Sequence, residues 1–269
     1  MSLINELKRI SSQHNFRQSK RLSQSFLFDE RVLVREAEYA ALQDKVVLEI
    51  GPGFGFLTKR LASAGAKKVI AVEKDARLIP VLEREFVKFP NIEVVHADFL
   101  EGSFKADVVV SNVPYAISSP LLFRLATMRF ERAILCLQKE FVDRMLAKPG
   151  TKEYSRLSVT SQAVFKIRLL ERVPRSAFYP QPKVDSALIE IIPTGEKLNE
   201  KTARLVLLLF QHRKKTLRAA ISDAAEALGM TKEEARSIAE KSGFSARRVF
   251  TLTKEEIVTL ASSSCAPHR

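Results

Sequence analysis

The chain has 269 residues, 46% of them hydrophobic and 28% charged, which is enough for one large domain or for a domain with a small companion. Its 44 Lys and Arg residues against 31 Asp and Glu give a formal charge of +13. That excess favours a polyanionic partner, nucleic acid or an anionic membrane surface, and disfavours a protein that binds only small neutral metabolites. Two cysteines far apart in sequence exclude a disulfide framework, and the four histidines lack the spacing of a helical metal site.

Membrane-spanning and secreted proteins are disfavoured as well. The longest apolar runs, such as residues 205–210, are too short to cross a bilayer. The N-terminal MSLINELKRI lacks the apolar stretch of a signal peptide. We therefore expect a cytoplasmic protein with no metal and no membrane partner.

Strands alternate with helices over the first half of the chain. Short apolar runs predict strands at residues 46–50, 67–73, 92–99, 106–112 and 131–137. Helical spacing predicts helices at 57–64, 75–89 and 121–128, with Asp75 as the N-cap of the second. This alternation predicts a parallel sheet with helices on both faces.

The pattern changes after Leu170. Two strand-like runs flank a proline-rich stretch that excludes a helix, which predicts an added β-hairpin ending near Pro193. From Asn199 the pattern is helical, with breaks at Gly229 and Gly243. We therefore expect a catalytic domain over residues 1–194, including a basic N-terminal arm, and a small all-helical domain over residues 195–269.

A glycine-rich turn, EIGPGFG, follows the first predicted strand and gives the sharpest early signal of a ligand. Gly51, Gly53 and Gly55 permit positive φ and close approach of a ligand to the backbone, while Glu49 can accept from a cationic amino group. Glu73, about 20 residues further on, is placed to bind ribose hydroxyls. Asp98, after the third strand, can meet an adenine edge. The spacing differs from that of a dinucleotide site and favours S-adenosylmethionine, the alternative being a tight turn that binds nothing.

The fourth strand leads directly into NVPY, where open α/β sheets place their chemistry. The Asn112 side-chain oxygen and the Val113 carbonyl could hold the two hydrogens of an adenine amine, a poor nucleophile because its lone pair is delocalised. Pro114 stiffens the loop, and Tyr115 offers an aromatic face to a base taken out of its stack. The structural alternative is an ordinary turn at a strand end.

With these residues in view, the sequence resembles the KsgA-type rRNA adenine dimethyltransferases. The resemblance covers almost the whole chain and includes SQSFL, EIGPGFGFLT, VEKD, ADFL, NVPY, FYPQPKVDSA and FQHRKKTLRAAI. Ser25 stands where bacterial members typically have Asn, and NVPY replaces the commoner NLPY. From the residues alone Phe178 could simply cap the core, whereas the resemblance implies that it stacks on the target adenine opposite Tyr115.

The resemblance implies an α/β, Rossmann-like class I S-adenosylmethionine-dependent methyltransferase core with a small all-helical C-terminal domain. The implied reaction dimethylates two adjacent adenosines near the 3′ end of small-subunit rRNA, within a partly assembled small subunit, by a monomeric enzyme. The implied catalytic residues are Asn112, Val113, Pro114, Tyr115 and Phe178. The implied cofactor residues are Gln24, Ser25, Leu27, Glu49, Gly51, Gly53, Gly55, Glu73, Lys74, Asp98, Phe99 and Asn112.

Two basic clusters flank this region in sequence and predict a surface that tracks phosphates. One lies in the N-terminal arm, and the other is expected on a single helical segment of the C-terminal domain. The residues expected to bind RNA are Lys20, Arg21, Lys183, Arg213, Lys214, Lys215 and Arg218.

Three other functions remain open at this point. An erythromycin-resistance-type enzyme acting on large-subunit rRNA would share the fold and the loop after the fourth strand. A non-catalytic RNA-binding biogenesis factor could keep the fold without the activity. A DNA adenine methyltransferase would need base-reading elements that the sequence does not reveal.

Overall fold

The computed structural model describes residues 2–14, 16 and 24–263. Residues 262 and 263 are described through their backbone alone. The chain divides into two compact units. The first runs to Val142 and resumes over Ile167–Pro193, and the second comprises Asp143–Lys166 and the chain from Thr194 onward.

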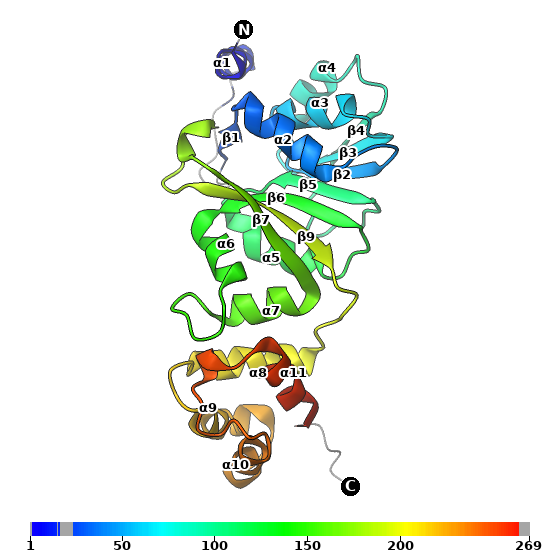
Figure 1. Cartoon of the computed structure of the whole chain (residues 1–269). Helices are drawn as coiled ribbons and strands as arrows, with labels where there is room; N and C mark the ends of the chain where they lie inside the picture. Colours follow the sequence, from blue (N-terminus) through cyan, green and yellow to red (C-terminus); the bar gives the residue numbers. More distant parts are fainter. Residues whose placement is uncertain (1, 15, 17–23, 264–269) are drawn as a thin grey trace. The chain divides into compact units, whose positions relative to one another are not determined.

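The first unit is built on a seven-stranded sheet with the order β4-β3-β2-β5-β6-β9-β7 (Figure 1). Neighbouring strands from β4 to β6 are parallel, whereas β9 runs antiparallel to β6. Strand order reverses between β2 and β5, so the carboxyl ends of these strands face a crevice where such sheets bind ligands. The strands are β2 (Val46–Ile50), β3 (Lys68–Glu73), β4 (Ile92–His96), β5 (Val108–Asn112), β6 (Arg132–Gln138), β7 (Phe165–Val173) and β9 (Ser186–Pro193).

The central strands are continuous apolar runs because both faces of the sheet are covered. Val47 and Leu48 of β2, Val109 and Val110 of β5 and Leu135 of β6 are all inaccessible to solvent. The helices of this unit are α1 (Leu3–Gln13), α2 (Glu30–Ala40), α3 (Phe56–Ser63), α4 (Ile79–Glu85) and α5 (Ser118–Leu125), with single turns at η1 (Tyr115–Ile117) and η2 (Arg175–Ala177).

A second, two-stranded sheet joins two segments that are far apart in sequence. It pairs β1 (Phe26–Leu27) with β8 (Phe178–Tyr179) in antiparallel register, Leu27 opposite Phe178. The Ser25 hydroxyl adds a 2.6 Å hydrogen bond to the carbonyl of Pro180. The N-terminal segment is therefore fastened to the proline-rich loop beside the crevice.

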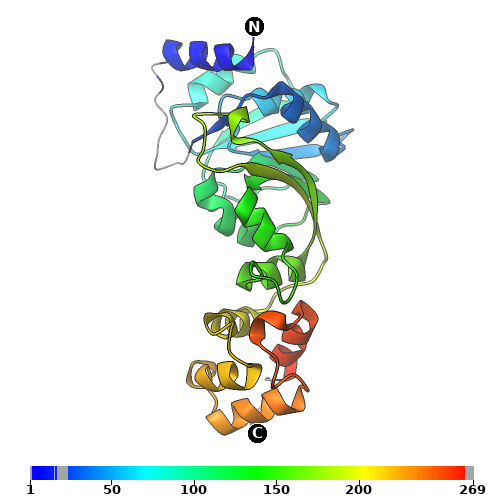
Figure 2. The same cartoon turned by 60° about the vertical axis from the view of Figure 1, so that its left-hand side comes forward.

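Helix α1 closes over the same end of the unit, and Figure 2 shows it lengthwise. Its Leu7 and Ile10 are buried in the main apolar core, and Glu6 lies 3.8 Å from Lys59 of α3. Phe16 continues this contact, since its ring packs edge-on against Phe54 at 5.3 Å.

The expected helix over 75–89 is wrong at its start. Helix α4 begins at Ile79, and Asp75 is not its N-cap. The Asp75 carboxylate instead accepts from the backbone and guanidinium of Arg77 and from the Gln24 amide at 2.8 Å. These bonds favour a turn before the helix and hold the pKa of Asp75 below its ordinary value, the Arg77 side chain being the main cause.

The second unit is helical, with its own apolar core that includes Tyr154, Leu209 and Ile221. Asn199, Thr216 and Thr231 cap three of its helices with side-chain oxygens. None of the described helices of the protein is long and apolar enough to cross a bilayer. The elements are α7 (Arg156–Val164), α8 (Glu200–Gln211), α9 (Leu217–Asp223), η3 (Glu226–Leu228), α10 (Lys232–Lys241), η4 (Val249–Thr251) and α11 (Lys254–Ser263).

The two units are not the consecutive domains expected from the sequence. Thr194 is one point where the chain enters the second unit, but Asp143–Lys166 also belongs there. The reason is packing, because Ala147, Tyr154 and Val159 are buried in the helical core, and the Tyr154 hydroxyl donates to the carbonyl of Leu252 at 3.0 Å. Helix α6 (Lys139–Leu146) and strand β7 carry the other two crossings of the chain between units.

Candidate active site

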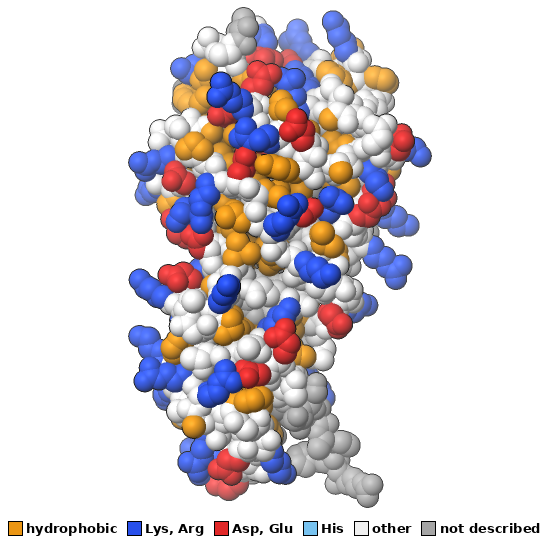
Figure 3. Space-filling view, viewed as in Figure 1, with side chains coloured by type: hydrophobic (Ala, Val, Ile, Leu, Met, Phe, Trp, Pro, Cys, Tyr) orange, Lys and Arg blue, Asp and Glu red, His pale blue; other side chains and the backbone are white. Residues whose placement is uncertain are grey.

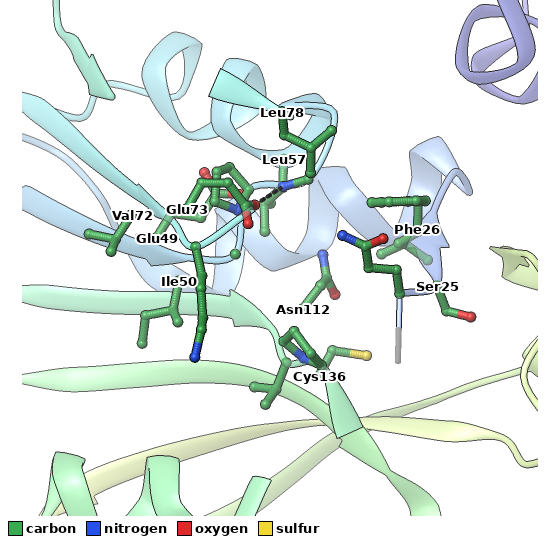
Figure 4. Close-up of a pocket in the computed structure, with 18 of the residues that line it drawn as sticks. Ser25, Phe26, Glu49, Ile50, Leu57, Val72, Glu73, Leu78, Asn112 and Cys136 are labelled. Carbon is green, nitrogen blue, oxygen red and sulfur yellow. Dashed lines mark hydrogen bonds between the residues drawn. The ribbon is translucent and has the colours of Figure 1, made fainter. Parts of the chain in front are cut away.

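A cavity of ≈ 390 Å³ opens at the carboxyl ends of β2, β3 and β5 in the first unit. Its size suits a small ligand or cofactor. Figure 4 shows Asn112 projecting into this space, with Glu49 and Glu73 on one side and Ser25 and Phe26 on the other. The cavity thus combines side chains from the glycine turn, the NVPY segment and the N-terminal segment.

The glycine turn supplies one wall through Gly51 and Gly53, and only glycine fits at Gly53. Its φ is +61°, and an added Cβ would lie 2.8 Å from the Phe26 ring. The amide of Gly51 is held by the carbonyl of Val72 at 2.9 Å. Gly55 does not line the cavity, since a Cβ there would meet the Phe86 ring at 2.5 Å. Its role in the structure is close packing beneath the turn.

Glu73 is anchored at the end of β3 by two backbone amides. Its oxygens accept from Gly53 N at 3.3 Å and from Asp75 N at 2.8 Å. Burial raises the pKa of Glu73 above its ordinary value, although these backbone hydrogen bonds oppose the shift. Each carboxylate oxygen keeps a further lone pair for a ligand, so the anchoring is compatible with binding of ribose hydroxyls.

Glu49 lines the cavity with one oxygen unsatisfied. It is 2% exposed, and its Oε2 has no hydrogen-bond partner among the described residues. Burial, with a smaller contribution from the nearby Glu73, raises the pKa of Glu49 to about 8, although the Thr58 hydroxyl opposes the shift. A buried acceptor of this kind calls for a donor, and a cationic donor satisfies both the hydrogen bond and the charge.

Asp98 and Lys74 lie at the cavity edge and contact each other. The Lys74 ammonium donates to Asp98 Oδ2, and the Asp98 Oδ1 accepts from the amide of Leu100 at 2.9 Å. Partial burial acts to raise the pKa of Asp98, but these two donors hold it below the usual range. Asp98 is thus an ionised acceptor beside Phe99, which is buried and also lines the cavity.

Asn112 ends β5, and the two ends of its side-chain amide have different hydrogen-bonding environments. Its amide nitrogen Nδ2 donates to Glu36 Oε2 at 3.1 Å. Its oxygen Oδ1 is buried and has no described hydrogen-bond partner. The amide therefore presents an unsatisfied acceptor, as the sequence-based hypothesis for amine recognition requires.

The residues after Asn112 continue along the cavity wall. The amide of Val113 is bound to the carbonyl of Cys136 at 3.1 Å, and Pro114 packs against the glycine turn, 3.7 Å from where a Gly51 Cβ would stand. The Tyr115 hydroxyl lies 2.7 Å from Ser186 Oγ. Burial raises the pKa of Tyr115, so its ring is held in place as a neutral phenol.

Phe178 lines the cavity and is also part of the core. It is 5% exposed and packs with the main apolar cluster. The Phe178 ring can therefore pack in the core and also stack on a base, and a base can reach it only from inside the cavity. Gln24, Ser25 and Leu27 also line the cavity.

Glu36 and Cys136, both close to Asn112, could not be predicted from the sequence as residues of the site. Glu36 lies in an amphipathic helix where a glutamate usually faces solvent, and only the fold shows that it is 1% exposed. Cys136 lines the cavity from β6, where it pairs with Asn112 across the ladder. Burial and the nearby Glu36 raise the pKa of the Cys136 thiol well above its ordinary value, so it stays neutral. No motif spacing marks either residue.

The basic residues divide into those that are structurally engaged and those that face solvent. Arg213 donates to the carbonyl of Lys152 at 2.8 Å and covers the Phe250 ring at 5.6 Å. Lys215 pairs with Asp223 and Arg218 with Glu240, both as exposed ion pairs, while Lys183 and Lys214 are exposed. Lys20 and Arg21 lie outside the described residues.

The single helical segment expected for the second basic cluster is wrong. Residues 212–216 form a turn, because α8 ends at Gln211 and Thr216 caps the new helix α9. Figure 3 shows Lys and Arg spread over the whole face in view, among acidic and apolar side chains, with no single basic patch there.

The cavity fits S-adenosylmethionine on three observations of its residues. Gly53 leaves room at the turn, Glu49 and Asn112 offer buried acceptors without described partners, and Glu73 and Asp98 present carboxylates at the adjoining strand ends. Fold and site together define a class I S-adenosylmethionine-dependent methyltransferase with a Rossmann-like core.

Comparison with known proteins narrows this class. Residues 15–256 match the family described as Ribosomal RNA adenine dimethylase, and the chain belongs to that family. It is 46% identical to a probable ribosomal RNA small subunit methyltransferase A of Thermococcus sibiricus, covering 91% of this chain and 92% of the relative. A relative of the same description from Methanopyrus kandleri is 39% identical, with 98% of each chain covered.

Similar solved structures agree with this family assignment. A dimethyladenosine transferase from Plasmodium falciparum is 31% identical with a TM-score of 0.79, covering 87% of this chain and 95% of that one. The 23S rRNA methyltransferase ErmE is 30% identical with a TM-score of 0.66, covering 88% and 98%. The predicted family, fold class and cofactor are confirmed.

Proposed function

We propose that the protein transfers methyl groups from S-adenosylmethionine to the exocyclic N6 amines of two adjacent adenosines near the 3′ end of small-subunit rRNA. The observation that carries the proposal is the Asn112 amide on the cavity wall, whose Oδ1 is buried and unsatisfied while Glu36 holds Nδ2. An acceptor fixed in this way suits an N–H donor of a base.

On this proposal, recognition of the amine needs two acceptors. Asn112 Oδ1 and the Val113 carbonyl would each accept one N6 hydrogen, which favours a pyramidal nitrogen with its lone pair free. When bound, S-adenosylmethionine supplies an electrophilic methyl group. The N6 nitrogen would lose one proton once it carries the added methyl group. No strong base is required, because that proton becomes acidic only after transfer, so positioning carries the rate.

The same proposal assigns the remaining walls. Tyr115, fixed through Ser186, and Phe178 would hold the base between aromatic faces. Glu49 would accept from the amino group of the cofactor, Glu73 from its ribose and Asp98 from its adenine. Dimethylation of two bases needs up to four transfers, so the cavity must also admit the monomethylated base.

The partner and setting are part of the proposal. We infer a monomer that acts in the cytoplasm on a partly assembled small ribosomal subunit, in small-subunit biogenesis. Support comes from the charge of +13 and from relatives whose name refers to the ribosomal RNA small subunit. Solvent-facing Lys183 and Lys214 are the clearest candidates for phosphate contacts.

Transfer of labelled methyl groups tests the proposal. Undermethylated small subunits, large-subunit RNA and DNA are offered separately, with Asn112→Ala as the matched control. Label in adjacent dimethyladenosines of the small subunit, absent with Asn112→Ala, is the expected result. Label in large-subunit RNA would favour the activity for which ErmE is named. Tight, salt-dependent binding to small subunits without label would instead identify a binding factor.

A further inference from the structure

Glu36 is the one fully buried acid of this region that the mechanism above leaves without a task. It lies on α2, is 1% exposed, and has apolar neighbours in its helix such as Leu33 and Ala40. Its Oε2 accepts from Asn112 Nδ2 at 3.1 Å, while its Oε1 has no described partner. Burial raises the pKa of Glu36 to about 8, and the Asn112 hydrogen bond opposes that shift.

We propose that Glu36 is a positioning residue that fixes the orientation of the Asn112 amide so that Oδ1, and not Nδ2, faces the reacting amine. The inference rests on the proposed function, since it concerns the same acceptor. Glu36 does not line the cavity and would not touch cofactor or base. It would act only through Asn112.

The argument begins with the geometry of an amide. A rotation of the Asn112 amide by half a turn exchanges its oxygen and its nitrogen at almost no change in shape. In one orientation the cavity receives an acceptor for the N6 hydrogens. In the other it receives two N–H donors, which cannot accept those hydrogens. Something must therefore distinguish the two ends of the amide.

Glu36 provides that distinction. Glu36 Oε2 accepts from Nδ2, and this hydrogen bond favours the ionised form of the carboxyl. The ionised form accepts hydrogen bonds and cannot donate one to Oδ1, so it selects Nδ2 and turns Oδ1 away. It is the only described side chain recorded in a hydrogen bond with the Asn112 amide. Cys136, across the ladder, is a neutral thiol and selects poorly.

The surroundings argue against a purely structural role for this carboxyl. A carboxyl surrounded by apolar side chains, with one oxygen unsatisfied, does not favour folding by itself. Replacing such a group by an apolar side chain of similar volume is often neutral or stabilising. Glu36→Leu is therefore expected to fold with an unchanged or higher melting temperature.

The test compares Glu36→Leu and Glu36→Gln with wild type, and uses Glu38→Gln as a control because Glu38 is exposed on the same helix. Methyl transfer to undermethylated small subunits is measured at saturating cofactor and RNA. We expect Glu36→Leu to lower kcat on the order of tenfold, which corresponds to about 1.4 kcal/mol, with KM for cofactor little changed. Glu36→Gln, which keeps an acceptor oxygen, should recover part of the rate, and Glu38→Gln should match wild type.

A second readout does not depend on the reaction. In asparagine-labelled protein, the side-chain NH₂ signals of Asn112, identified by their absence in Asn112→Ala, report the bond to Glu36. We expect these signals to shift in Glu36→Leu and to stay unchanged in Glu38→Gln. Unchanged Asn112 signals in Glu36→Leu would overturn the inference, as would a kcat equal to wild type or a parallel loss of kcat, cofactor binding and melting temperature. An inactive wild type with the expected NMR shift would instead count against the proposed function.

Discussion

The affinity for S-adenosylmethionine should rise with pH, because the buried Glu49 carboxyl must be ionised to attract the cationic amino group of the ligand. Without a ligand, burial raises the pKa of Glu49 to about 8. A carboxyl with that pKa is about 1% ionised near pH 6 and about 24% ionised near pH 7.5. A cationic ligand binds best to the ionised form, since opposite charges attract in a site of low dielectric.

The size of the effect follows from these populations. When only the ionised fraction binds tightly, the apparent Kd is divided by that fraction, so affinity should rise about 25-fold between about pH 6 and pH 7.5. Binding near neutral pH should also release close to one proton per site. Glu36, close enough to Glu49 for their charges to repel, also has a pKa of about 8, so the two carboxyls titrate over a wider pH range than either alone.

Calorimetry across this range, in buffers of different ionisation enthalpy, measures both the affinity and the released protons. Glu49→Gln is the matched variant and should bind more weakly at the higher pH, with a flatter pH dependence. An affinity that varies by less than about threefold in wild type, with no proton released, would refute the electrostatic account of Glu49.

Three further changes test other parts of the structure. Gly53→Ala should lower cofactor affinity by about tenfold or more, because a Cβ at a φ of +61° would lie 2.8 Å from Phe26 and must push the cavity wall; cofactor titration checks it, and wild-type affinity would contradict it. Phe178→Ala should lower the melting temperature as well as RNA turnover, because a buried ring leaves a cavity worth about 3–5 kcal/mol; an unchanged melting temperature would mean that the ring serves the base alone. Lys214→Ala should weaken RNA binding and reduce its salt slope by about one, whereas Arg213→Ala should also destabilise the protein through loss of the Lys152 and Phe250 contacts. Binding titrations at several salt concentrations, together with melting curves, separate these two effects. An unchanged salt slope for Lys214→Ala would place the RNA elsewhere.

The sequence predicted the sheet well because its central strands carry an unambiguous signal. Val47, Leu48, Val109 and Val110 belong to continuous apolar runs that only a strand buried on both faces explains. The acids and the amide that end these strands follow from the same logic, since parallel strands bring their carboxyl ends to one edge. Eleven of the twelve expected cofactor residues accordingly line one cavity, the exception being Gly55.

Features set by contacts between distant segments were not predictable. Asp75 looks like a helix cap, but Arg77 and Gln24 occupy its carboxylate. Tyr154 looks like a loop residue of the first domain, but its ring is buried in the helical core of the second unit. Glu36 has the spacing of a surface acid. No local pattern predicts that its Oε2 lies 3.1 Å from Nδ2 of Asn112, a residue 76 positions away in sequence.

The pairing of β1 with β8 has a thermodynamic consequence for the binding of cofactor and RNA. Leu27, which faces the expected cofactor, and Phe178, which faces the expected base, are opposite each other in one short ribbon. Where a ligand bound against one strand stiffens the other, the two binding events share a coupling free energy. Such coupling is reciprocal: by whatever factor the cofactor improves the affinity for the RNA, the RNA improves the affinity for the cofactor.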